Sequence, residues 1–93
     1  MARTTINRLR NLIRTLNYVV STHAAEELED DELSILDLEN IIFTGQITER
    51  QRDIKTREIK YLISGFTLDE RLAQAVVKVG FTGKIIIITI YVL

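Results

Sequence analysis

The sequence lacks cysteine and proline, and it contains a single histidine, His23, among its 93 residues. The absence of cysteine excludes disulfide bonds and thiolate metal sites. With one imidazole, a zinc site would need mainly carboxylate ligands, so we expect neither a metal nor another cofactor. The absence of proline is consistent with strands that pair along their whole length.

Long hydrophobic runs are also absent. The longest apolar stretches, residues 85–88 and 90–93, are separated by Thr89 and are far shorter than the ~20 residues of a membrane helix. The N-terminus has neither the apolar segment nor the cleavage site of a signal peptide. We therefore expect a cytoplasmic protein with no membrane partner, and a chain of this length predicts a single domain over residues 1–93.

Charge is segregated along the chain, although the formal net charge is only −1. Residues 1–17 contain arginines and no acid, residues 24–40 contain eight acids and no base, and residues 46–60 are again rich in bases. A basic segment can hold phosphates through Coulomb attraction and counterion release. Alternatively, the charges pair across the fold or cover solvated faces. The near-zero total favours the second interpretation.

The first half of the chain has helical periodicity. Apolar residues recur at spacings of three and four in the first segment, at Ile6, Leu9, Ile13 and Leu16. This stripe predicts an amphipathic helix with Thr4 or Thr5 as its N-cap. Residues 18–21 are then a short strand or an extended link. Thr22 is the expected N-cap of a short second helix, which carries Ala24, Ala25 and Leu28.

A third helix is predicted from Ser34 to Gly45. Ser34 and Asp37 have the spacing of a capping box, in which each side chain binds the other residue's backbone N–H. Ile35, Leu38, Ile41 and Ile42 follow on one side of the helix. Gly45 is the expected C-cap.

The second half changes to the period of two that is typical of strands. Residues 46–54 are polar and predict an edge strand, and residues 58–66 alternate more strongly. Residues 71–81 and 84–93 flank Thr82-Gly83, a predicted hairpin turn. The last strand is apolar on both faces, so we expect it to be central or covered on both sides. The predicted fold is α+β, with N-terminal helices packed on one face of a roughly four-stranded antiparallel sheet.

Four short motifs occur in a distinctive order. They are Ser21-x-His23-Ala24, Leu33-Ser34-x-x-Asp37, the Gly45 helix end, and Thr89-x-Tyr91. Together they resemble a family of small bacterial proteins of unassigned function, similar in fold to the RelE, ParE and BrnT toxins of toxin–antitoxin pairs. The resemblance covers residues 18–91 and implies a RelE-like domain with a curved sheet. It also implies a cognate antitoxin, and RNA or the ribosome, as partners.

Toxins of the RelE type cleave mRNA without a metal, using side chains on the open face of the sheet. The reaction needs a base for the 2′-hydroxyl, cations for the phosphate and an acid for the leaving oxygen. The resemblance makes His23 and Tyr91 the catalytic candidates. The candidate RNA-binding residues are Arg50, Arg52, Arg57 and Lys60.

Each candidate also has a structural interpretation. His23 can hydrogen-bond a backbone carbonyl at the strand-to-helix junction, and Tyr91 can be a core residue with its hydroxyl at the rim. Arg50 and Arg52 share one face of a strand, which suits either a phosphate contact or a solvated edge. The choice between enzyme and non-enzyme therefore stays open at the level of sequence.

Two functions follow from these alternatives. The chain is either a RelE-like toxin or relative that targets RNA, as a metal-independent endoribonuclease, or a non-catalytic binding or regulatory module with the same fold. Family members commonly carry a basic residue where this chain has Asp30 and Asp31, and its absence favours the module. The apolar last strand further predicts a homodimer, because an uncovered apolar face or edge is usually buried by a partner.

Overall fold

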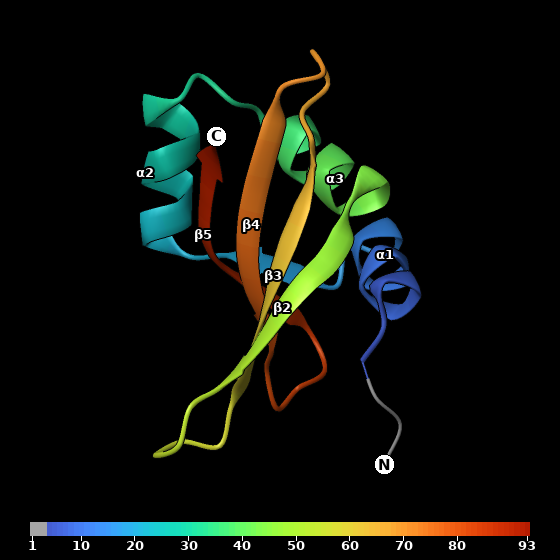
Figure 1. Ribbon diagram of the computed structural model, residues 1–93, viewed down its shortest axis with the longest axis vertical. Coiled ribbons are helices and arrows are strands. Elements are labelled where there is room, and N and C mark those ends of the chain that lie inside the picture. Colours follow the sequence, from blue (N-terminus) through green and yellow to red (C-terminus); the bar gives the residue numbers. More distant parts are fainter. Residues whose placement is uncertain (1–3) are drawn as a thin grey trace.

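The computed structural model describes residues 4–93 as three helices and five strands (Figure 1). The helices are α1 (Ile6–Arg14), α2 (Thr22–Asp30) and α3 (Ile35–Thr44). The strands are β1 (Tyr18–Val20), β2 (Gln46–Arg52), β3 (Ile59–Phe66), β4 (Leu72–Val79) and β5 (Ile85–Val92). No helix in this part of the chain is long and apolar enough to cross a membrane.

The five strands form one mixed sheet in the order β1-β5-β4-β3-β2. The α+β class is confirmed, and β2 lies at an edge as predicted. The prediction of four antiparallel strands was incomplete, because Tyr18–Val20 forms a fifth strand that pairs in parallel with β5. A short strand was one of the two alternatives for residues 18–21, and what the sequence did not reveal is its pairing with β5. The residues of β1 pair only with Ile85–Ile87, so β5 has a strand on each side over these residues. After Ile87 the outer edge of β5 has no strand partner within residues 4–93.

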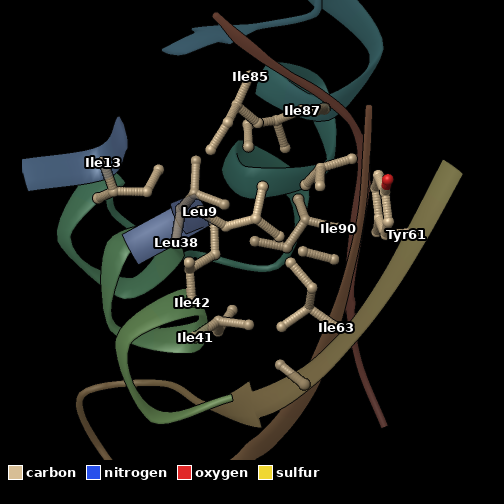
Figure 2. Close-up of a cluster of buried hydrophobic side chains, with 14 of the residues drawn as sticks. Leu9, Ile13, Leu38, Ile41, Ile42, Tyr61, Ile63, Ile85, Ile87 and Ile90 are labelled. Carbon is tan, nitrogen blue, oxygen red and sulfur yellow. The ribbon is translucent and has the colours of Figure 1, made fainter. Parts of the chain in front are cut away.

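The hydrophobic core lies between one face of the sheet and the helices (Figure 2). Leu9 and Ile13 of α1 meet Leu38, Ile41 and Ile42 of α3 above the sheet. All five side chains are buried. The sheet contributes Tyr61, Ile63, Ile85, Ile87 and Ile90. Burial of one such aliphatic side chain stabilises the fold by about 1.5–3 kcal/mol.

Two residues of the predicted apolar stripes do not reach this core. Leu16 is 71% exposed, because α1 ends at Arg14 and Leu16 has a left-handed backbone with φ 59°. Ile35 is 43% exposed, because it occupies the first turn of α3, ahead of the turns that pack on the sheet. The stripes were therefore predicted one residue too long, at the C-terminal end of α1 and the N-terminal end of α3.

Side-chain caps begin all three helices. Thr5 caps α1, where its hydroxyl accepts from Arg8 N at 3.3 Å. The predicted Thr22 cap of α2 was wrong by one residue, since Ser21 Oγ accepts from Ala24 N at 3.0 Å. Ser21 is still extended, and its N–H continues the β1–β5 pairing by donating to the Ile87 carbonyl. The helix therefore starts directly after the strand.

Two glycines bring the end of α3 close to β3. Gly45 is the C-cap, as predicted, but its φ of −88° is not left-handed. A Cβ at Gly45 would lie 2.4 Å from the Ile41 carbonyl oxygen, and one at Gly65 would lie 2.1 Å from the same oxygen. Glycine is therefore needed here for close approach of two backbones and not for its conformational freedom.

Candidate functional site

One face of the sheet has no helix on it within residues 4–93. The helices α1 and α3 lie over the opposite face, and α2 lies beside the outer edge of β5 (Figure 1). We call the uncovered side the open face. The strand register places four rows of side chains on it: Gln51, Lys60, Lys78, Ile86 and Val19; Glu49, Leu62, Val76 and Thr89; Gln46, Ser64, Gln74 and Tyr91; and Phe66 and Leu72.

Tyr91 belongs to a polar row that crosses the open face. Its hydroxyl donates to Gln74 Oε1, and Gln74 Nε2 donates to Ser64 Oγ at 2.9 Å. These bonds connect β5, β4 and β3 through side chains alone. Tyr91 is half-buried and is not a core residue, contrary to the structural interpretation. To act as an acid, its hydroxyl would have to leave Gln74.

His23 lies at the start of α2 beside the unpaired part of β5. Its Nε2 is 3.2 Å from Glu27 Oε1, one helical turn along the chain. The same oxygen accepts from the Thr89 hydroxyl and, at 3.0 Å, from Ile90 N. The His23 side chain is 68% exposed, whereas that of Glu27 is 23% exposed. His23 thus lies within ion-pair distance of a carboxylate, and within residues 4–93 it makes no hydrogen bond to the backbone carbonyl that its structural interpretation expected.

Glu27 has a clear structural reason to lie here. Because β1 ends at Val20, β5 has backbone groups at its outer edge with no strand partner, and unpaired buried groups are costly. Glu27 accepts from Ile90 N, and Ser21 Oγ donates to the Ile88 carbonyl at 3.1 Å. Side chains of α2 and its cap therefore complete the edge that β1 leaves open. As a consequence, His23 contacts a carboxylate that Thr89 and Ile90 hold in place, and most of the His23 ring is exposed to solvent.

Arg50 and Arg52 lie on one face of β2, as predicted, but this is the helix-covered face of the sheet. Their register partners are Tyr61 and Ile59. The Arg50 guanidinium lies 5.8 Å from the centre of the Tyr61 ring and donates to the Thr4 carbonyl at 3.4 Å. A bulge between Ile47 and Glu49 shifts the alternation of the strand and places these arginines on the helix-covered face, where both remain exposed.

The other two predicted RNA-binding residues lie near the ends of the hairpins. Arg57 is in the loop between β2 and β3, and Lys60 is on the open face, directly opposite Lys78. His23 and Tyr91 are at β5, three strands from β2, or about 14 Å at the usual spacing. The structure therefore divides the predicted site residues among four places, with His23 and Tyr91 in separate contacts, and does not assemble one catalytic centre from them.

A family model described as a domain of unknown function, DUF4258, matches residues 20–92. The chain belongs to this family. No curated protein and no solved structure matches it significantly. The RelE-like fold therefore stays a prediction, and the assigned family carries no function of its own.

The sequence did not predict three residues of this DUF4258 domain that contact the catalytic candidates or extend their contacts. They are Glu27, beside His23, and Gln74 and Ser64, in the row of Tyr91. Glu27 was detectable, because it follows His23 by four residues and so shares its helix face. Gln74 and Ser64 depend on strand register, which the sequence did not reveal. No group of three or more histidine, aspartate or glutamate side chains within residues 4–93 could hold a metal ion.

Proposed function

We propose that this DUF4258 chain is a RelE-like protein of the toxin–antitoxin type that works by binding, through the open face of its sheet. The observation that supports this proposal is the apolar middle of that face. Leu62, Val76, Ile86 and Val19 lie across four strands and form its contiguous part, whereas Phe66 and Leu72 are a second apolar pair beyond the polar row of Ser64, Gln74 and Tyr91. Val19, Phe66 and Leu72 are each at least 44% exposed. Contiguous apolar surface of this kind marks interaction sites.

A second copy of the chain is the occupant that this face favours. Five strands at the usual spacing and up to eight residues long give a flat area of roughly 500 Å². Side-chain relief raises the accessible area toward the low end of specific interfaces, about 600 Å² per partner. A twofold axis through the Leu62 and Val76 row would place the lysine rows of the two copies at opposite ends. The dimer would then bury apolar side chains and keep like charges apart.

Sedimentation equilibrium at micromolar concentration tests the dimer. We expect twice the chain mass of 10.7 kDa, and we expect Leu62→Glu to give a monomer because it places a charge in the centre of the interface. Ile54→Glu, in the exposed loop between β2 and β3, is the matched control and should stay dimeric. A wild-type monomer, or a dimer that Leu62→Glu leaves intact, contradicts the proposal. A monomer that binds the product of a neighbouring small gene through Leu62 would assign the face to an antitoxin instead.

Metal-independent RNA cleavage is the second candidate, and the contact between His23 and Glu27 favours it. Glu27 is held by Thr89 and Ile90, and its Oε1 lies 3.2 Å from Nε2 of His23, so the carboxylate orients the ring and leaves the other ring nitrogen away from this contact. An exposed, oriented imidazole of this kind suits a general base. The acidic helix around it and the distance to the arginines of β2 oppose phosphate binding at this point.

Expression toxicity and cleavage of cellular RNA separate the two candidates. A nuclease should lose about 100-fold or more of its activity in His23→Ala, the usual effect of removing a general base. Tyr91→Phe should also lower the rate if the hydroxyl is the acid. Arg8→Ala, at an exposed position on α1, is the control. A wild type that is not toxic and leaves RNA intact contradicts cleavage and leaves the binding function.

A further inference from the structure

We propose that the hairpin end of the molecule binds single-stranded RNA, with Phe81 as a stacking platform. The hairpin end comprises the β2–β3 loop (residues 53–58), the β4–β5 loop (residues 80–84) and the adjoining strand ends, and both loops lie at the same end of the molecule in Figure 1. A cavity of about 650 Å³ opens between them. Its volume falls within the usual range for small-ligand pockets. The proposal adds a ligand to the binding function and does not depend on the dimer.

Phe81 is the aromatic component of the site. It lines the cavity and is fully exposed, which is unusual for a phenylalanine. The loop that carries it is held by its own backbone, because Gly80 N donates to the Lys84 carbonyl at 2.8 Å and Gly83 N donates to the Gly80 carbonyl at 2.9 Å. The left-handed φ of 90° at Gly83 allows this turn. An exposed ring on a well-defined turn offers a face on which a base can stack.

Arg57 supplies a cation at the rim of the same cavity. It adopts a left-handed backbone with φ 61°, an uncommon state for a residue with a long side chain. Its N–H donates to the Asp53 carbonyl at 2.8 Å, which closes the loop. Within residues 4–93 its guanidinium takes part in none of the ion pairs. The loop therefore presents Arg57 toward solvent beside the cavity.

Lys60 and Lys78 add a second positive element. They face each other directly across β3 and β4, and like charges in such positions destabilise a sheet. Glu58 relieves part of this repulsion through an ion pair with Lys78 at 2.7 Å. The other nearby acid, Asp53, is occupied within its own loop, where Oδ1 accepts from the N–H groups of Lys55 and Thr56. One phosphate near the two lysines would remove the remaining repulsion.

The combination of features favours a nucleic acid over a lipid surface. Ile54, in the β2–β3 loop of the hairpin end, is 92% exposed, and apolar tips with cations also occur in proteins that touch membranes. Here, however, Arg57, Lys78 and Phe81 are among the residues that line a concave space, together with Glu58 and Thr4, whereas a bilayer presents a flat surface. Alternating phosphates and unstacked bases fit a cavity that has cations and one exposed ring.

Fluorescence anisotropy with a labelled 12-nucleotide single-stranded RNA of mixed sequence is the test, at low salt. Phe81→Ala should weaken binding about 5- to 100-fold, the usual effect of losing one stacking contact. Arg57→Ala should weaken binding and lower the slope of log affinity against log salt by about one. Matched controls are Leu68→Ala, an exposed apolar side chain at the other end of the sheet, and Arg8→Ala, an exposed arginine on α1. Neither control should change the affinity.

Several outcomes would overturn the site. These are an absence of RNA binding, binding that ignores both Phe81→Ala and Arg57→Ala, and binding to anionic phospholipid vesicles that exceeds binding to RNA. Preference for DNA of the same sequence would contradict RNA as the ligand. Circular dichroism melts establish that each variant is folded. Leu62→Glu should disrupt the dimer without weakening RNA binding. Phe81→Ala should weaken RNA binding and leave the dimer intact. Each proposal can therefore be contradicted without the other.

Discussion

At the scale of single residues, Asp37 connects more of the fold than its place in a capping box suggests. Its Oδ2 accepts from Ser34 N at 2.8 Å, and Ser34 Oγ accepts from Asp37 N in return. Its Oδ1 accepts from Leu68 N at 2.9 Å, in the loop between β3 and β4. The hydrogen bond from the backbone N–H of Ser34 is the main cause that lowers the pKa of Asp37, and the bond from Leu68 N–H adds to it. Burial acts in the other direction and raises the pKa, but by less. One carboxylate therefore fixes both the start of α3 and a turn of the sheet.

This lowered pKa gives a prediction for acid stability. A carboxyl group whose pKa is lower in the folded state stabilises the protein above its unfolded pKa, and this contribution is lost as the pH falls through the folded value. Asp37→Asn should lower the free energy of unfolding at pH 7 by about 1–2 kcal/mol. The difference from wild type should shrink below pH 4, as urea denaturation at several pH values would show. Asp30→Asn, at an exposed position on α2, should change little at any pH.

At the scale of elements, the helix starts were predictable and the strand pairing was not. Ser34 and Asp37 form a capping box from local spacing alone, and the hairpin at Thr82-Gly83 follows from a local turn signal. The placement of Arg50 on the helix-covered face depends on a bulge, and the position of Tyr18–Val20 depends on pairing with residues 67 positions later. Both are tertiary effects with no local signal. The same limit applies to the candidate site. The contact of Glu27 with His23 could be predicted from helical spacing, whereas the contact of Gln74 with Tyr91 depends on strand register.

The contact between α3 and β3 gives the second prediction. Gly65→Ala should destabilise the protein strongly, by about 2–3 kcal/mol or more, because the new Cβ would overlap the Ile41 carbonyl oxygen and two backbones would have to separate. Thermal unfolding followed by circular dichroism measures the effect. Gly83→Ala is the control, since nothing lies within 4 Å of its Cβ position. Only the left-handed φ should cost stability there, about 1 kcal/mol. Equal effects at the two glycines would show that α3 is not held close to the sheet.

At the scale of the whole molecule, α1 lies before the segment that the family model matches and yet belongs to the core. The match starts at residue 20, whereas Leu9 and Ile13 are buried under α3 and the sheet. Arg10 also joins α1 to the end of α3, with Nη2 donating to the Gly45 carbonyl at 2.9 Å. Without α1, one side of α3 would lose its cover. The family segment alone should therefore not fold in this chain.

Leu9 and Leu16 provide a matched test of this dependence, because both belong to the apolar stripe that the sequence predicts for the first helix. Leu9→Ala should cost about 2–5 kcal/mol, since its side chain is fully buried. A domain of this size has a total stability of only about 5–14 kcal/mol. Leu16→Ala should cost less than about 0.5 kcal/mol, since that side chain is 71% exposed. Urea denaturation compares the two, and a fragment of residues 18–93 should lack a cooperative transition. A fragment that unfolds cooperatively with wild-type stability would show that α1 is an addition to the fold and not part of its core.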